Sequence, residues 1–135
     1  MPTLDTVIPL SALSAIVLDL ETTGLDVRTD RIVQIGAVMI TDGQIDHDSI
    51  ISININPGVD IPERAVRVHG LTAARLKDAP TIDQAFADLI ALIGDLPIIG
   101  FNIGFDLAVL NNEARRHNID WDIPPAICLR LLSQA

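Results

Sequence analysis

An apolar segment that ends in two acids constrains this chain more than any other feature. It runs from Ala15 to Leu20, and Asp19 and Glu21 lie at its end. Because side chains alternate along a strand, positions two apart share a face, so we expect both carboxylates to project together from the carboxyl end of the strand. Two carboxylates aimed at one point repel each other unless a cation lies between them. Mg²⁺ and Mn²⁺ prefer oxygen ligands, so the pair predicts a hard divalent cation.

The length and composition of the chain limit its class. With 135 residues and 49% hydrophobic content, it fits one domain over residues 1–135, and domains of this size bury roughly two thirds of their unfolded surface. Its one cysteine, Cys128, permits no internal disulfide and forms no zinc site by itself, which agrees with a reducing compartment. Met1 to Asp5 lack the basic region of a signal peptide, and no apolar run approaches the roughly 20 residues that cross a bilayer. We therefore expect a cytoplasmic protein without a membrane partner.

The formal net charge of −9 argues against broad neutralisation of nucleic-acid phosphates, which needs clustered Lys and Arg. It does not exclude nucleic acid at a metal site, because bound cations would invert the local field. A solubilising role explains the acidic balance equally well. Scattered positive charge is available around the expected loops from Arg28, Arg31, Arg64, Arg67 and Arg75.

Two further strands are expected at residues 32–40 and 51–55, where apolar and β-branched residues predominate. Asp42-Gly43 lies between them and tolerates the positive φ angles of a two-residue hairpin turn. The pattern therefore predicts an antiparallel ribbon beside the first strand.

Two helices are expected next. Pro62 begins a short helix that runs through Val68 and stops at Gly70. A capping box that begins at Thr81 precedes apolar residues at helical spacing, and Gly94 ends that second helix. The second helix can cover one face of the sheet.

A strand, helix, strand pattern follows the ribbon. We expect a buried strand at 97–101, an amphipathic helix from Phe105 to His117, a strand at 126–128, and the start of a helix after it. The sequence therefore predicts an α/β fold with a mixed sheet, in which an antiparallel hairpin joins parallel strands and helices flank them. The chain stops inside the last helix without a stop signal, so we expect the C-terminal part of the domain to be missing.

Asp106 is a candidate third acid, in the first turn of the helix that follows the strand at 97–101. A helix dipole favours an acid there by about 0.3–1 kcal/mol without any chemistry. If the strands at 16–20 and 97–101 are parallel neighbours, however, their carboxyl ends open on the same edge of the sheet, where α/β sheets bind ligands. Asp106 would then face Asp19 and Glu21. Three such acids can hold two cations about 3.5–4 Å apart, the spacing that supports phosphodiester displacement.

Four segments, taken in order, resemble the DnaQ-like 3′–5′ exonucleases of the DEDD superfamily. They are Val17–Leu25, Ile32–Ala37, Ile61–Thr72 and Asn102–Asp106. The resemblance implies a ribonuclease H-like fold and two-metal hydrolysis of terminal phosphodiester bonds in DNA or RNA. It also implies a single-stranded 3′ end as the substrate, and a polymerase or additional domains as partners.

The same resemblance implies roles for individual residues. Asp19, Glu21 and Asp106 would be the catalytic metal ligands for Mg²⁺ or Mn²⁺, and Asp19 would bridge the two ions. The loop that contains Thr22 and Thr23 would lie against the terminal nucleotide, with backbone amides near the 3′ end. Turn formation after a strand explains these threonines equally well.

Three more positions match substrate-binding residues of the family. Leu25 would touch a base or sugar. Asn102 matches a family asparagine, although Phe101 stands where a histidine is common, and a helix cap explains Asn102 as well. His69 matches the family's His-Gly-Ile-Thr element, and closure of the short helix is the structural explanation for it.

The family also needs a fourth acid and, in one branch, a general base in a His-x4-Asp pattern. His117 and Asp122 match that pattern literally, but His117 ends the helix that Asp106 begins. At 1.5 Å per residue it would lie about 16 Å from the metals along the helix axis, whereas a general base must act within about 3 Å. His47 has no acidic partner at the right spacing. We therefore expect a fragment of a longer exonuclease, or a degenerate domain, and feeble hydrolysis at most.

Two other functions are compatible with these residues. A binding module would recognise nucleic-acid ends or mononucleotides without cleaving them. A phosphatase with a nucleophilic Asp fits poorly, because such enzymes place a second Asp where this chain has Glu21. A partial domain would also leave apolar sheet surface exposed, from which we expect self-association.

Overall fold

The computed structural model describes residues 9–133, so the predictions made on Met1–Asp5 and on Gln134-Ala135 lie outside the described residues. One five-stranded sheet forms the centre of the fold, in the order β3-β2-β1-β4-β5. Its strands are β1 (Ala15–Thr22), β2 (Ile32–Thr41), β3 (Gln44–Asn54), β4 (Ile98–Gly100) and β5 (Ala126–Cys128). The helices are η1 (Leu10–Ala12), α1 (Glu63–His69), α2 (Ala73–Leu76), α3 (Ile82–Ile93), α4 (Ile103–Arg116) and α5 (Leu129–Ser133).

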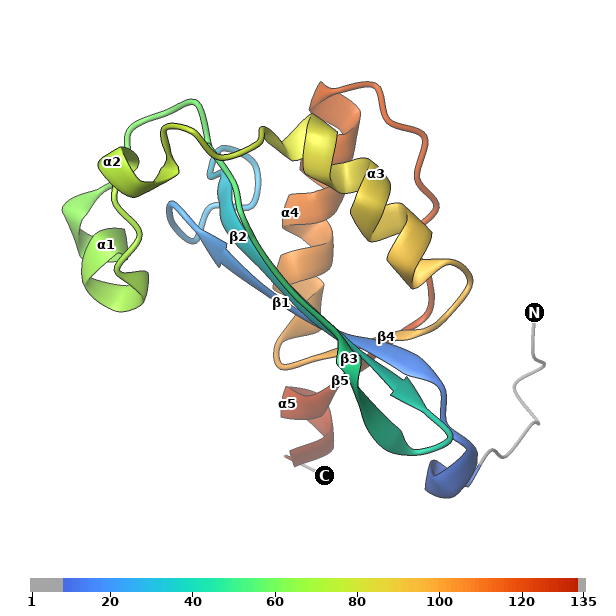
Figure 1. The fold of residues 1–135 in the computed structure, drawn as a ribbon. Helices are drawn as coiled ribbons and strands as arrows, with labels where there is room; N and C mark the ends of the chain where they lie inside the picture. The colour runs from blue at the N-terminus through green and yellow to red at the C-terminus, as the bar shows by residue number, and fades with distance from the viewer. Residues whose placement is uncertain (1–8, 134–135) are drawn as a thin grey trace.

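The central strand β1 makes the sheet mixed, as predicted. It pairs antiparallel with β2 along its whole length and parallel with β4 through two registered pairs, Ile16 with Ile98 and Val17 with Ile99. In Figure 1, α3 and α4 pack side by side against one face of the sheet, and α1 and α2 lie beyond the carboxyl end of β1. The predicted α/β, ribonuclease H-like architecture is confirmed.

The hairpin between β2 and β3 forms at the predicted turn. Asp42 and Gly43 both have positive φ angles, 50° and 74°, and Thr41 pairs directly with Gln44. The predicted start of the outer strand at residue 51 was wrong, because β3 begins at Gln44. Pairing with β2 outweighs the low strand propensity of the acids in this segment, and charged side chains are common on an edge strand.

The helix ends follow their capping residues. Gly70 ends α1 in the left-handed conformation at φ 73°, and the backbone N–H of Thr81 donates to the side chain of Gln84 at the start of α3, at 3.2 Å. The short helix α2 was not predicted. The start of α4 lies two residues before the predicted Phe105, because Asn102 adopts a left-handed conformation that turns the chain directly into the helix.

The core lies between the sheet and the pair α3 and α4. Ile16, Leu18 and Leu20 alternate with outward-facing residues along β1 and are almost completely buried. Phe86 of α3 is fully buried and meets Trp121 edge to face, with ring centroids 5.5 Å apart. Within residues 9–133, no helix has the length and apolar composition needed to cross a membrane.

Gly100 lies where β4 passes close to β1, so a substitution there tests how closely the two strands must approach. A Cβ at this position would lie 2.9 Å from the backbone oxygen of Leu18, so we expect Gly100→Ala to destabilise the fold by about 1–3 kcal/mol. Gly104→Ala is the matched control, because a Cβ there meets nothing within 4 Å and Ala favours a helix. Urea denaturation of both variants measures the difference; equal free energies of unfolding would contradict the packing argument.

Candidate active site at the end of the central strand

Asp19 and Glu21 project from the face of β1 that α3 and α4 leave uncovered. Their neighbours Leu18 and Leu20 point into the core, so the strand's alternation places both acids on the other side. Asp19 is exposed and Glu21 is half-buried. The predicted shared face is confirmed.

Asp106 approaches β1 where β4 ends. Because β4 contains only three residues, the chain leaves the sheet after Gly100 and begins α4 at Ile103. Asp106 lies in the first turn of α4 and is only 4% exposed.

The three acids lie within electrostatic reach of one another. The pKa of Asp106 is raised from 3.8 to about 7, first by burial and then by the negative charge of Asp19. The hydrogen bond from Leu20 lowers this pKa in part, and Glu21 raises it further. A carboxyl group that holds its proton near neutral pH beside two other carboxylates marks a place where positive charge is favourable.

The acids suit a metal by their chemistry. Three carboxylates form the all-oxygen donor set that Mg²⁺ and Mn²⁺ prefer. Among residues 9–133, however, no group of three or more His, Cys, Asp or Glu side chains is arranged as a ready metal site. The donor set therefore fits a hard cation, although the ligand geometry is not preformed.

A cavity of about 620 Å³ opens beside Glu21, between the end of β1, the loop that follows it, and α1. Two apolar side chains flank it and are unusually exposed, Leu25 at 87% and Val68 at 82%. Phe105 contributes an aromatic surface from α4, and Arg64 contributes positive charge from α1. The cavity thus combines apolar walls with a charged rim. Its lining consists of Leu20, Glu21, Thr22, Thr23, Gly24, Leu25, Asp26, Asp30, Arg64, Ala65, Val68, His69 and Phe105.

The two predicted threonines shape the loop over residues 22–31. The hydroxyl of Thr22 donates to the backbone oxygen of Gly24 at 2.7 Å, and that of Thr23 donates to the carboxylate of Asp30 at 2.8 Å. The other oxygen of Asp30 accepts from the backbone N–H of Asp26 at 2.8 Å. Both threonine side chains line the cavity, and both also hold the turn after β1 through these hydrogen bonds.

His69 connects α1 to β1. Its Nδ1 accepts a hydrogen bond from the backbone N–H of Leu71 at 3.0 Å, so its Nε2 carries the proton in the neutral ring. That Nε2 lies 3.2 Å from the backbone oxygen of Thr22, to which it donates. Both ring nitrogens therefore bond to backbone groups, and His69 also lines the cavity.

Asn102 lies outside the cavity lining. It occupies the N-cap position of α4, but its side chain makes no capping hydrogen bond. Its side-chain oxygen instead accepts from Arg130 of α5 at 3.4 Å. Asn102 is therefore the N-cap residue of α4 by position, although its side chain does not cap the helix.

The two histidines that were considered as a general base, His117 and His47, lie at separate places in the fold. His117 caps the C-terminal end of α4, where its Nε2 is 3.5 Å from the carboxylate of Glu113, and Asp122 lies in the loop beyond it. His47 is on the edge strand β3, where it shares the lining of a shallow groove with Asp19. No histidine among residues 9–133 forms a metal group with the acids.

Sequence reasoning missed several residues that the fold brings to this region. Asp30 closes the loop, Phe105 and Val68 line the cavity, and Glu113 is a buried acid on α4. The glycine at position 24 is an indirect sign that Asp30 packs there, because a Cβ on Gly24 would lie 2.5 Å from Asp30. The others carry no local pattern, because their roles depend on contacts between distant segments.

Comparisons with known proteins agree with this geometry. A family model described as Exonuclease matches residues 16–135. The chain is 39% identical over 105 residues to DNA polymerase III subunit epsilon of Rickettsia conorii, across 77% of this chain and 45% of that protein. Exonuclease X in complex with 5′ overhanging duplex DNA superimposes with a TM-score of 0.69 and 26% identity, covering 89% of this chain and 62% of that one. Escherichia coli exonuclease I in complex with a dA16 oligonucleotide shares the fold, with a TM-score of 0.77 and 19% identity over 91% of this chain and 29% of that one.

The matched relatives are longer than this chain. It spans 45% of the Rickettsia protein. It is also 35% identical over 127 residues to a Mycobacterium tuberculosis protein that has exonuclease and endonuclease in its name. That match covers 88% of this chain and 19% of the Mycobacterium protein. The aligned region contains all three acids and the cavity.

The raised pKa of Asp106 predicts a specific dependence of stability on pH. Between about pH 4 and pH 7 the carboxyl group of Asp106 keeps its proton in the folded chain but has lost it in the unfolded chain. The free energy of unfolding therefore falls as the pH rises through this interval. With a chelator present to remove metals, we expect the free energy of unfolding of the wild type to fall by about 2–4 kcal/mol relative to that of Asp106→Asn across this interval. Urea denaturation at several pH values measures this difference. Parallel pH curves for the two proteins would contradict the prediction.

Proposed function

Because this chain belongs to the DnaQ-like exonuclease family, we propose that it carries the metal-dependent 3′–5′ exonuclease site of its protein. The observation that carries the proposal is the meeting of Asp19, Glu21 and Asp106 at the open end of β1, beside the large cavity. Ends of nucleic-acid chains are the substrates that this function requires.

In this proposal Asp19, Glu21 and Asp106 would hold two Mg²⁺ or Mn²⁺ ions. The ions would activate water and stabilise the charge that develops on the terminal phosphodiester. The raised pKa of Asp106 supports its role as a ligand, because a cation replaces the proton that the carboxyl group otherwise retains. Asp106 would therefore bind the metal more tightly as the pH rises.

The cavity would hold the terminal nucleotide of a single-stranded 3′ end. Leu25 and Val68 would offer apolar surfaces to a base or sugar, and Phe105 would offer a ring against which a base can stack. Thr22 and Thr23 would act through the loop backbone that they hold. Exonuclease X, a relative by structure, is solved in complex with duplex DNA that has a 5′ overhang.

A second candidate function is a module that binds nucleic-acid ends or nucleotides without cleaving them. The observation in its favour is that no His, Cys, Asp or Glu side chains among residues 9–133 form a preformed metal group. Binding in the cavity requires neither a fourth ligand nor a base.

The proposed function also involves partners of this chain and its location in the cell. Relatives named DNA polymerase III subunit epsilon and DNA polymerase III PolC-type support association with a polymerase or with additional domains. A cytoplasmic location is part of the same proposal. Self-association of this chain is also part of the proposal, since Phe101 and Leu131 are 66% and 67% exposed near the edge of the sheet.

Hydrolysis by this chain tests the proposal directly. We expect slow release of mononucleotides from a single-stranded oligonucleotide with Mn²⁺, because the described acids suit metal binding but lack a base within reach. Asp106→Ala should abolish the release, whereas Asp88→Ala, which removes an exposed acid of α3, should leave it unchanged. Chromatography of the products measures the rate. Robust turnover would show that a base is present after all, and equal rates in Asp106→Ala would refute the proposed site.

Arg64 tests the use of the cavity by a nucleic-acid phosphate. It lines the cavity, whereas Arg67 on the same helix pairs with Glu63 at 2.8 Å and does not. We expect Arg64→Ala to weaken binding of a single-stranded oligonucleotide about 3–10-fold at low salt and to reduce the slope of log affinity against log salt by about 1. Arg67→Ala removes the same charge and should have little effect. Fluorescence anisotropy in Ca²⁺ measures both, and equal effects would contradict a local phosphate contact.

A further inference from the structure

Glu113 is a buried acid that the proposed chemistry does not use. It lies seven positions after Asp106 on α4, about two helical turns further along the same face, and is 1% exposed. It does not line the large cavity. A buried charge away from a site is costly unless partners satisfy it, so its partners indicate what it does.

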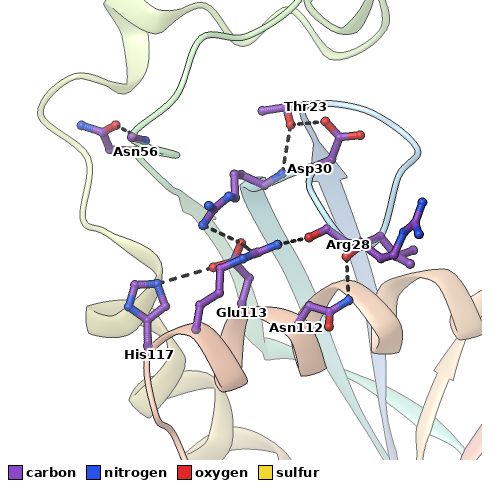
Figure 2. Close-up of polar contacts among 11 residues, drawn as sticks. Thr23, Arg28, Asp30, Asn56, Asn112, Glu113 and His117 are labelled. Atoms are coloured by element: carbon purple, nitrogen blue, oxygen red, sulfur yellow. Dashed lines mark hydrogen bonds and ion pairs between the residues drawn. The ribbon is translucent and has the colours of Figure 1, made fainter.

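Arg31, Arg116 and His117 surround its carboxylate, and Figure 2 shows the contact with His117 as a dashed line. Its Oε1 accepts a hydrogen bond from Nη1 of Arg116 at 2.6 Å and lies 3.8 Å from Nη1 of Arg31. Arg116 comes from the same helix, but Arg31 comes from the end of the loop that follows β1. Glu113 therefore connects α4 to that loop.

The arginines extend this connection to the loop backbone. Nη2 of Arg116 donates to the backbone oxygen of Arg28 at 2.5 Å, and Asn112 donates to that of Val27 at 2.8 Å. Figure 2 shows Glu113 and Asn112 on α4 facing the loop that carries Arg28 and Asp30. One face of α4 thus holds the loop at several points, with Glu113 at the centre.

Arg31 also bonds to Thr23, a residue that lines the cavity. Its backbone N–H donates to the hydroxyl of Thr23 at 2.9 Å, and its backbone oxygen accepts from the N–H of Thr23 at 2.8 Å. Thr23 in turn holds Asp30, which closes the loop around Gly24. A movement of Arg31 would therefore move two residues that line the cavity.

The network is poorly suited to a purely stabilising role. Nε of Arg31 and Oε2 of Glu113 are both buried and make no hydrogen bond with the described residues, and Nε2 of His117 lies 3.5 Å from that Oε2. Buried ion pairs with unmet hydrogen bonds often contribute less stability than apolar side chains of the same size. What the charges do supply is one defined orientation of Arg31 and Arg116 against the loop.

We propose that Glu113 is a positioning residue that holds the loop of residues 22–31 in the conformation that binds the terminal nucleotide. It acts through Arg31 and Arg116 and does not touch the substrate. This inference rests on the proposed function for its binding readout. Loss of Glu113 lets the loop leave the binding conformation, so the apparent affinity falls by the fraction of time the loop is displaced.

The test compares Glu113→Gln with a variant that is destabilised elsewhere. Ile93→Ala removes a buried side chain at the far end of α3 and lowers stability without touching the loop. We expect Glu113→Gln to raise the Kd for a single-stranded oligonucleotide about 10-fold in Ca²⁺, and Ile93→Ala to leave it within about 2-fold. Both are measured below their unfolding transitions.

Amide hydrogen exchange supplies a readout that needs no ligand. Glu113→Gln should speed exchange in residues 24–31 more than in β2 or α3, whereas Ile93→Ala should speed exchange throughout. If Glu113→Gln does not fold, Asn112→Ala removes only the contact to Val27 and should produce a smaller change of the same kind. Equal effects of Glu113→Gln and Ile93→Ala on affinity, or uniform exchange in Glu113→Gln, would overturn the inference. Failure of the wild type to bind any oligonucleotide would refute the proposed function, and the exchange result would still decide whether Glu113 holds the loop.

Discussion

The parallel contact between β1 and the short strand β4 is the constraint on which the site depends. Only two residue pairs are in register, and Gly100 allows the backbone to pass close to Leu18 before the chain turns into α4. A longer β4 would cover the edge of β1 with backbone, and Asp106 would have no access to Leu20. Because β4 stops early, the first turn of α4 can bring a buried carboxyl group beside Asp19 and Glu21.

The cavity beside these acids is built mainly from residues that bond to one another. Thr22, Thr23 and Asp30 shape the loop, and His69 attaches α1 to the end of β1. The resemblance to the family implies that such residues lie near substrate, and their hydrogen bonds fix the shape of the cavity wall. Leu25 remains exposed at the cavity.

The electrostatics of the site point to a cation more strongly than its geometry does. Burial and two neighbouring carboxylates hold a proton on Asp106 near neutral pH, and positive charge would relieve the same repulsion. Whether the domain is an enzyme or a binding module depends on a different group, the base that accepts a proton from water. His117 resembles that base in sequence but lies against Glu113 at the far end of α4.

The sequence by itself determined the features that arise from neighbouring residues. Strand alternation placed Asp19 and Glu21 on one face, Asp42-Gly43 formed the hairpin turn, and Gly70 ended α1, because each depends on contacts within a few residues. Only the tertiary structure decided that His69 bonds to Thr22, 47 residues away, and that Arg116 of α4 holds the backbone of Arg28, 88 residues away. The start of β3 at Gln44 was likewise decided by pairing with β2. Such partners leave no periodic signal, because their separation along the chain is set by the path of the sheet and not by the geometry of any one helix or strand.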